Sequence, residues 1–170
     1  MTSMIIKTKR FTLRPFRKGD ERSHQKNIND KAIYKYTLRI PYPYTMQHAK
    51  KWVKLNLSPS KKQCRLVIDI EDEAAGSVSI ENMDGFKGEI GYWLAKKYWN
   101  KGIVTQAAGI MAKIGFKKLK LKRIYANIHH NNKSSARVLE KNGFLKEGLL
   151  KKAGLKKGKV FDVFMYAKVK

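Results

Sequence analysis

Residues 89–119 read EIGYWLAKKYWNKGIVTQAAGIMAKIGFKKL and contain a strand, a loop and a helix in immediate succession. Glu89–Leu94 is a short apolar and aromatic run typical of a β-strand, and Thr105–Leu119 carries apolar residues at helical spacing. Gly102 in the connecting loop allows a ligand to approach the backbone closely. Because the first N–H groups of a helix have no partner within it, this loop is predicted to hold a phosphate group.

The loop Trp99–Thr105 matches neither of two common phosphate-binding motifs, G-x-x-x-x-G-K-[ST] and G-x-G-x-x-G. One exposed helix-end charge interaction contributes only about 0.3–1 kcal/mol, so several N–H donors and Lys101 would have to act together. An ordinary strand-to-helix turn is the alternative interpretation of this segment.

The N-terminal half is predicted to form a strand, two helices and three further strands. The first strand lies within Ile5–Phe16, one helix spans Asp20–Asn29 with Asp20 as its cap, and a second helix follows a Thr45 cap. Between the helices, Arg39–Tyr44 reads RIPYPY, which predicts an extended loop with exposed aromatic side chains because proline fixes φ. Three successive antiparallel strands are then expected at Cys64–Ile70, Ala75–Ile80 and Glu89–Leu94.

The C-terminal part adds a strand, a helix and two more strands. Asn132–Asn142 is the predicted helix, with Asn132 as its cap and Gly143 as its left-handed stop. The strands are predicted at Arg123–His129, Phe144–Leu150 and Val160–Val169. This order indicates an α/β fold, a single domain over residues 1–170 with a mixed, mostly antiparallel sheet of about seven strands flanked by about four helices.

Composition limits the class of protein. The chain has 170 residues with 42% hydrophobic and 11% aromatic residues, enough apolar surface for a globular core and too much for a disordered chain. The formal net charge of +25 favours phosphate-rich partners or cofactors. One cysteine, Cys64, and no apolar signal-peptide segment in Met1–Arg10 favour a cytoplasmic location, and no apolar run is long enough to span a membrane.

A second motif lies at residues 132–144, NKSSARVLEKNGF. A helix capped by Asn132, ended by Gly143 and followed by a core phenylalanine accounts for this motif without any functional role. In combination with the loop before Thr105, however, the chain resembles the GNAT superfamily of acyl-CoA-dependent N-acyltransferases, whose signature is N-x-x-S-x-x-x-L-E-K-x-G-F. FTLRPF at Phe11–Phe16 and EIGYWL at Glu89–Leu94 are similar to the branch that holds the ribosomal-protein (alanine or serine) N-terminal acetyltransferases.

The resemblance implies acetyl-CoA as co-substrate and no metal. In the family, the fourth strand splays from the fifth and the pantetheine arm inserts beside it. The loop is like the family form W-G-K-G-[YI]-[AGV]-T-E-A, but Asn100 replaces the usual Gly and Gln106 the usual Glu. Val104 stands where Gly or Ala is usual, and its branched side chain is expected to narrow the space beside the pyrophosphate. The implied cofactor contacts are Leu94 and Ala95 to pantetheine, Asn100, Lys101, Gly102, Ile103, Val104 and Thr105 to pyrophosphate, and Asn132 and Ser135 on the far side of the cofactor arm.

The implied reaction is direct attack of a neutral amine on an acetyl thioester through a tetrahedral intermediate, which needs a base, an oxyanion donor and an acid. Glu89 is the candidate base, with a solvated strand-end carboxylate as the alternative, and Ser135 or Tyr166 is the candidate acid. In a regular strand Tyr92 faces away from Glu89, so both line one cleft only if the strand has a bulge there.

Other chemistries have less support. His129 and His130 are adjacent in a predicted strand, so they are expected to face opposite ways and not to chelate a metal together. No G-x-S-x-G elbow is present, and Cys64 lies in no nucleophile motif, so a covalent acyl-enzyme is not expected.

The acceptor is predicted from amine basicity. At pH 7, deprotonating an α-amine with a pKa near 7.8 costs about 1.1 kcal/mol, against about 4.6 kcal/mol for a lysine-like amine near 10.4. A protein N-terminus is therefore favoured over polyamines or aminoglycosides, although Glu71–Glu73 could offset the positive field locally. The basic clusters Lys117–Arg123 and Lys151–Lys159 leave open a non-enzymatic RNA- or ribosome-binding module, and a monomer and a homodimer are both compatible with the sequence.

Overall fold

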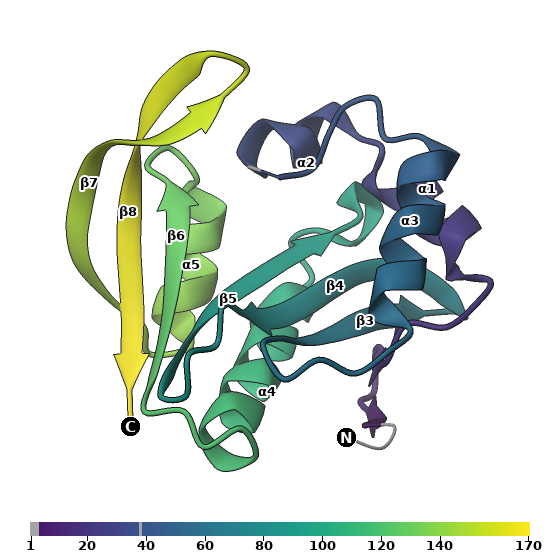
Figure 1. Cartoon of the computed structure of the whole chain (residues 1–170), viewed down its shortest axis with the longest axis horizontal. Coiled ribbons are helices and arrows are strands. Elements are labelled where there is room, and N and C mark those ends of the chain that lie inside the picture. The colour runs from purple at the N-terminus through teal and green to yellow at the C-terminus, as the bar shows by residue number, and fades with distance from the viewer. Residues whose placement is uncertain (1–3, 38) are drawn as a thin grey trace.

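A single mixed sheet forms the centre of the computed structural model, which describes residues 4–37 and 39–170 of the predicted 1–170 domain. The strand order is β1-β2-β3-β4-β5-β6-β8-β7, and every neighbouring pair is antiparallel except β5 and β6 (Figure 1). The strands are β1 (Ile6–Lys7), β2 (Thr12–Arg14), β3 (Cys64–Ile70), β4 (Glu73–Glu81), β5 (Lys87–Leu94), β6 (Arg123–His129), β7 (Leu145–Lys156) and β8 (Lys159–Val169).

The helices cover both faces of this sheet. On one face, Trp93 of β5 packs with residues of α1 and α3. On the opposite face, the next residue, Leu94, belongs to the main core, which also contains residues of α4 and α5. None of the helices in the described part of the chain is long and apolar enough to cross a membrane. The helices are α1 (Asp20–Ile28), α2 (Lys31–Tyr36), α3 (Met46–Asn56), a 3₁₀ turn η1 (Lys96–Tyr98), α4 (Ile103–Lys117) and α5 (Lys133–Lys141).

The predicted fold class is confirmed, with one more strand and one more helix than expected. The predicted strand Ile5–Phe16 is interrupted because Thr8 N–H donates to the Phe11 carbonyl at 2.9 Å and turns the chain between β1 and β2. The additional helix is α2, whose first turn is capped by Asp30, which accepts from the Ala32 amide at 2.6 Å.

Two local predictions in the N-terminal part are wrong. Asp20 is the first residue of α1 instead of its cap, and Gly19 occupies the cap position. Tyr44 is buried at 5% exposure in the cluster around Trp93, so the Arg39–Tyr44 loop does not expose all its aromatic side chains.

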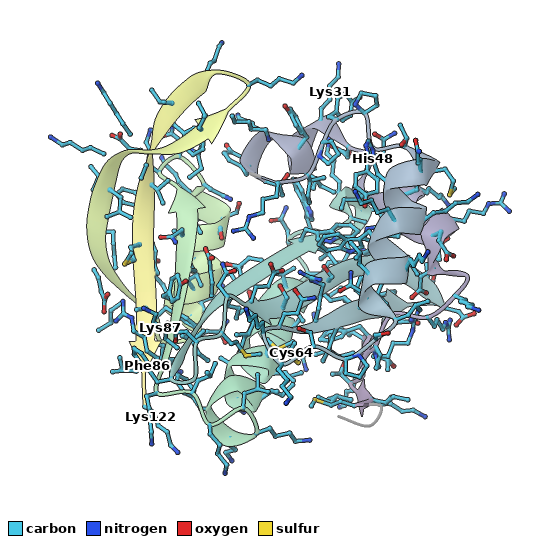
Figure 2. The ribbon with its side chains drawn as sticks, viewed as in Figure 1. Lys31, His48, Cys64, Phe86, Lys87 and Lys122 are labelled. Atoms are coloured by element: carbon cyan, nitrogen blue, oxygen red, sulfur yellow. The ribbon has the colours of Figure 1, made fainter. Side chains whose placement is uncertain are left out.

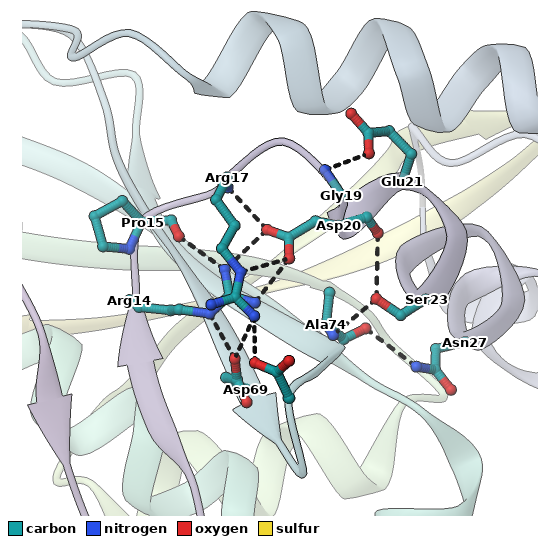
Figure 3. A network of polar contacts seen from close by, with 11 residues as sticks. Arg14, Pro15, Arg17, Gly19, Asp20, Glu21, Ser23, Asn27, Asp69 and Ala74 are labelled. Atoms are coloured by element: carbon teal, nitrogen blue, oxygen red, sulfur yellow. Dashed lines mark hydrogen bonds and ion pairs between the residues drawn. The ribbon is translucent and has the colours of Figure 1, made fainter.

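Asp20 instead belongs to a buried ionic network that fixes the N-terminal strand (Figure 3). Arg14 of β2 contacts Asp20 at 2.7 Å and Asp69 of β3 at 2.5 Å. Arg14 and Asp20 are both buried, and removing one partner of a buried pair leaves an uncompensated charge. The network therefore joins β2, β3 and the start of α1 as one unit.

The pairing of β5 with β6 positions the site. These parallel strands are in register only from Lys87–Glu89 against Arg123–Tyr125, at the start of each strand. Beyond that point β6 continues against β8 while β5 continues against β4, so the two strands part. The splayed pair expected from the sequence resemblance is present: the ladder between β5 and β6 ends at Glu89 and Tyr125, and the stretch beyond, up to Leu94 and the end of β6, is called the β5–β6 opening.

Candidate active site

The loop before α4 has the backbone that a phosphate cradle needs. Asn100 and Gly102 adopt left-handed conformations with φ of 60° and 69°, and α4 begins at Ile103. A Cβ added to Gly102 would meet nothing closer than the Arg10 guanidinium at 3.7 Å. Because the opening N–H groups of a helix have no internal acceptor, this end of α4 presents donors beside an accessible backbone.

Arg10 brings a positive charge to this loop from a distant part of the chain. Its guanidinium donates to the Lys101 carbonyl and, at 3.2 Å, to Gln106 Oε1. Lys101 places its ammonium 5.7 Å from the Tyr98 ring centroid on the same loop. Two cations therefore flank the N-terminus of α4, where the helix dipole already favours an anion.

A hollow of about 640 Å³ runs along α4 from this loop toward α5. Arg10, Lys113 and Lys141 line it with positive charge. On the α5 side of the hollow, Asn142 Nδ2 donates to the Thr105 carbonyl at 3.0 Å and so holds α5 against α4. The hollow and the loop form one continuous cationic surface through their shared residues Gly102 and Thr105.

Val104 is the second residue of α4. It is half-buried and packs against the main core, next to the buried Ile103. Part of its branched side chain therefore contacts the core, and the narrowing expected beside the pyrophosphate stays a prediction.

Leu94 and Ala95 differ in what they offer to a ligand. Ala95 N–H donates to the Ala75 carbonyl at 2.8 Å, and its carbonyl accepts from Tyr98 N–H at 2.9 Å. Because peptide groups alternate along a strand, those of Leu94 face the opening, where its carbonyl accepts from Trp99 Nε1 at 2.7 Å. The backbone of Ala95 is therefore already paired within the protein, and Leu94 N–H is the group that faces the gap.

Helix α5 places Ser135 beside the same opening. Asn132 Oδ1 accepts from the Ser135 amide at 3.2 Å, which confirms Asn132 as the helix cap. Ser135 Oγ lies 2.8 Å from the phenol oxygen of Tyr92 on β5, and Tyr92 Oη also donates to the Ser135 carbonyl at 3.2 Å. Burial raises the pKa of Tyr92 well above its ordinary value, so this phenol keeps its proton at neutral pH.

Glu89 lies on the opposite face of the sheet and is held by two amides. Its carboxylate accepts from Asn82 Nδ2 at 2.8 Å and from Asn127 Nδ2 at 3.2 Å. Asn127 Oδ1 is buried and has no hydrogen-bond partner in the described part of the chain. Glu89 is thus oriented by its neighbours instead of being a freely solvated strand-end carboxylate, and an unpaired acceptor lies next to it.

The three predicted catalytic residues do not form one cluster. The register of β4 with β5 is unshifted from Gly76↔Leu94 to Glu81↔Glu89, so the strand has no bulge there and Glu89 and Tyr92 face opposite sides. Ser135 lies on the α5 side, as does Tyr166, whose hydroxyl donates to Glu140 Oε1 at 3.0 Å. Glu89 and Tyr92 thus lie on opposite faces of β5, along the strand edge that parts from β6.

Residues 10–145 match the family model described as an acetyltransferase (GNAT) domain. The chain is a member of the GNAT family. This GNAT protein is 30% identical to the uncharacterized N-acetyltransferase p20 of Bacillus licheniformis over 169 residues. That match covers 96% of this chain and 94% of the relative. It is an acetyltransferase by family, and the fold predicted from residues 89–144 is the fold of its relatives.

Two further similarities concern function. The ribosomal-protein-serine acetyltransferase of Escherichia coli K12 is 32% identical to this GNAT protein over 101 residues, 58% of this chain and 56% of the relative. The Microcin C7 self-immunity acetyltransferase MccE, solved with acetyl-CoA and AMP, is 25% identical with a TM-score of 0.85, covering 96% of this chain and 94% of that one.

One prediction about this GNAT protein is wrong in its geometry. The rings of His129 and His130 do not point apart but stack with centroids 4.7 Å apart, because β6 ends at His129 and the chain turns. In residues 4–37 and 39–170, however, no group of three or more His, Cys, Asp or Glu side chains is placed to hold a metal ion.

Three residues of the candidate site were given no role from the sequence, although the side that Tyr92 faces was predicted. Arg10 reaches the α4 loop, Tyr92 bonds to Ser135, and Asn127 holds Glu89. Only Tyr92 and Asn127 had a usable signal, since the alternation of their strands predicts which face each side chain occupies. No local pattern links Arg10 to a loop that lies some ninety residues further along the chain.

Proposed function

We propose that this protein transfers an acetyl group from acetyl-CoA to the N-terminal α-amine of a protein. The observation that carries the proposal is the arrangement around the β5–β6 opening. A cationic cradle for phosphate lies on the α4 side, and an oriented carboxylate, Glu89, with the unpaired acceptor Asn127 Oδ1 lies on the other.

The residues of the cradle suit an acyl-CoA. The amides of Ile103, Val104 and Thr105 and the side chains of Lys101 and Arg10 would hold the pyrophosphate, and the cationic hollow along α4 would take the nucleotide end. Asn100 and Gly102 supply the loop conformation, while Leu94 N–H is free to pair with the pantetheine arm. When bound, acetyl-CoA supplies an acetyl group activated as a thioester.

Glu89 is the proposed base. An amine that approaches the Glu89 carboxylate beside Asn127 offers N–H donors to two oxygen acceptors, Glu89 and Asn127 Oδ1, of which Asn127 Oδ1 is unpaired among the described residues. As the new C–N bond forms, the amine proton goes to the Glu89 carboxylate directly or through one water molecule. Asn82 and Asn127 hold the carboxylate in place for this transfer.

Ser135 and Tyr92 are the proposed source of the second proton. As the C–S bond breaks, the departing thiolate takes a proton from this hydroxyl pair, and the pair regains one from solvent. Tyr166 is the weaker candidate acid because its proton is donated to Glu140, a bond that would have to break first. Asn132 acts indirectly, since it caps the helix that carries Ser135.

An α-amine acceptor is favoured over a polyamine. Spermidine N(1)-acetyltransferase of Escherichia coli K12 is also a relative, 26% identical over 140 residues, 81% of this chain and 74% of that one. Here, however, the acidic turn at Glu71–Glu73 is engaged by cations: Asp72 pairs with Arg17, and Glu73 pairs with Lys26 and Lys97. The turn therefore does not offset the positive field that opposes a polycationic acceptor.

The two basic clusters do not favour the RNA-binding alternative. Lys117–Arg123 lies where β6 begins and β8 ends, whereas Lys151–Lys159 surrounds the β7–β8 turn at the other end of β8 (Figure 1). Eleven residues of β8 separate them, about 35 Å of extended chain. The two clusters therefore lie at opposite ends of β8.

An acceptor panel tests the proposal. The protein is incubated with acetyl-CoA and with peptides that begin with Ser or Ala, with spermidine and with an aminoglycoside, and thiol release and product mass are measured. Faster acetylation of the peptides, at the α-amine, is the expected result. Faster acetylation of spermidine would overturn the acceptor class, and RNA binding with a steep salt dependence but no coenzyme A binding would overturn the enzyme.

A further inference from the structure

Four lysines beside α2 and the β7–β8 turn rest on tyrosine rings instead of on carboxylates. The ammonium of Lys156 lies 3.4 Å from the Tyr34 ring centroid, and that of Lys157 lies 5.5 Å from the same ring. Lys31 and Lys35 lie 6.0 Å and 5.1 Å from the rings of Tyr42 and Tyr36. Figure 2 shows Lys31 at the upper edge of the molecule beside α2.

Lys156 and Lys157 line a groove of about 320 Å³, which we name the tyrosine–lysine groove. Lys31 lies over Tyr42, another lining residue, and Lys35 follows the lining residue Tyr34 on α2. Tyr34, Arg39 and Tyr42 line it from the α2–α3 segment, and Leu155, Lys156 and Lys157 line it from the β7–β8 hairpin. Its volume is at the lower end of the range for binding pockets. The groove is therefore built from two separate parts of the chain that meet here.

Lys156 holds these two parts together. Its ammonium donates to the carbonyl of Thr37, the C-cap of α2, at 2.6 Å and to that of Tyr34 in the last turn of α2. This contact neutralises the negative end of the helix, but it adds no carboxylate to the groove. The wall formed by the hairpin is thus fixed against α2.

Two contacts connect the surroundings of the groove to the strands that carry Glu89 and Asn127. Arg39 of the groove reaches Glu81 at 3.5 Å, and Glu81 is paired directly with Glu89 on the same face of the sheet. At the other side, Tyr36 of α2 packs edge-on against His129 at 5.9 Å, and His129 lies two residues beyond Asn127 on β6. The proposed acceptor site and the tyrosine–lysine groove are therefore neighbours on one face.

The charge in this region is uncompensated. Within residues 4–37 and 39–170, none of Lys31, Lys35, Lys156 and Lys157 makes an ion pair with Asp or Glu. Burial lowers the pKa of His129, and the nearby charges of His130, Lys35 and Lys156 lower it further. A ligand with several carboxylates would supply the missing counter-charges.

We propose that the tyrosine–lysine groove binds the segment that follows the reacting α-amine, and that this segment carries Asp or Glu side chains. The inference rests on the proposed function, because it takes Glu89 as the place where the amine reacts. A polypeptide is favoured over a nucleic acid, since the ligand must be continuous with an amine held at Glu89. Acidic N-termini are thus the acceptor class.

Three peptides test this inference. All begin with Ser-Ala, and the next three residues are acidic, glutamine or lysine. For the full chain we measure kcat/KM for acetylation and, separately, binding of C-terminally labelled peptides in the presence of coenzyme A by fluorescence anisotropy. The acidic peptide is expected to exceed the lysine peptide by about tenfold or more in both assays, since several exposed charge pairs contribute together.

Charge reversal identifies the groove as the cause. In the Lys35→Glu/Lys157→Glu double variant, the acidic-over-lysine ratio is expected to fall at least about fivefold. Lys50→Glu, an exposed substitution on α3, changes net charge outside the groove and is expected to leave the ratio within about twofold. Lys31→Glu/Lys157→Glu replaces the first double variant if that protein does not fold.

The possible failures are distinguishable. Equal acetylation of all three peptides, or an equal effect of Lys50→Glu and of the groove variants, overturns the inference and leaves the N-terminal acetyltransferase standing. Selective binding of the acidic peptide without acetylation leaves the charge preference of the groove standing and contradicts the proposed function. Loss of RNA binding in the groove variants with an unchanged peptide ratio overturns the inference in favour of a nucleic acid.

Discussion

Tyr92 Oη lies 2.8 Å from Ser135 Oγ and so joins β5 to the helix that follows β6, across the opening between these strands. The phenol is buried, which raises its pKa and keeps it protonated at neutral pH. The pair is thus a proton-bearing contact next to the gap where a thioester would lie. Its position on the α5 side, away from Glu89, separates the proposed acid from the proposed base.

Removing either hydroxyl of this pair is expected to slow the reaction. Tyr92→Phe and Ser135→Ala should each lower kcat by about 10²-fold, with a small change in KM for acetyl-CoA, because the proton donor acts on the leaving group. The double variant should be little worse than either single one, since both residues serve one step. Steady-state kinetics check this, and an unchanged kcat in both single variants would remove the pair from the mechanism.

Glu89→Gln keeps the shape of the side chain but removes the carboxylate base. The expected result is a drop of about 10²–10⁴-fold in kcat/KM for the acceptor and a remaining rate that rises with pH as the amine loses its own proton. Glu81→Gln is the matched control because Glu81 lies opposite Glu89 on the same face and is paired with Arg65. Equal losses in the two variants would indicate a general electrostatic effect instead of a base.

Arg10→Ala tests the contribution of the N-terminal segment to the cradle. Its KM for acetyl-CoA should rise about tenfold, because a cation beside the phosphate site and two hydrogen bonds that hold the loop are lost. Acetyl-pantetheine, which lacks the nucleotide and its phosphates, should respond much less to the substitution. Similar increases in KM for both acyl donors would show that Arg10 supports the fold and not phosphate binding.

His24 is expected to make stability depend on pH. Burial lowers the pKa of His24 to about 4, whereas the unfolded residue titrates near 6.5. Between these values the unfolded chain binds a proton that the folded chain does not, so stability falls as pH drops, by about 2 kcal/mol from pH 7 to pH 5. Urea unfolding at both pH values measures this, and an equal pH dependence in His24→Gln would contradict it.

The elements that the sequence predicted well are those with a clear local pattern. Cys64–Ile70 and Arg123–His129 have the predicted bounds because β-branched and apolar residues repeat there between polar breaks. Helix α2 was missed because its six residues are too few to show a helical period, so that Asp30 and tertiary packing decide it.

The candidate site was predicted to the extent that it is local. The glycine loop before α4 and the Asn132 cap follow from short motifs, and both have the expected backbone. The bond of Tyr166 to Glu140 and the contact of Arg10 with Lys101 depend on how distant segments pack, which spacing along the chain does not encode. The same reason explains why Tyr44 was expected at the surface and lies in the core.

The central claim is that the amides at the start of α4 hold the diphosphate of coenzyme A. Calorimetric titration of the protein with coenzyme A tests it most directly, alongside Gly102→Asn and Gly102→Asp, which both tolerate the left-handed backbone but differ in charge. The account predicts one-to-one binding that protects against thermal unfolding, and an Asp variant about tenfold weaker than the Asn variant. If the unsubstituted protein shows no heat of coenzyme A binding and no protection against thermal unfolding, the central claim is contradicted.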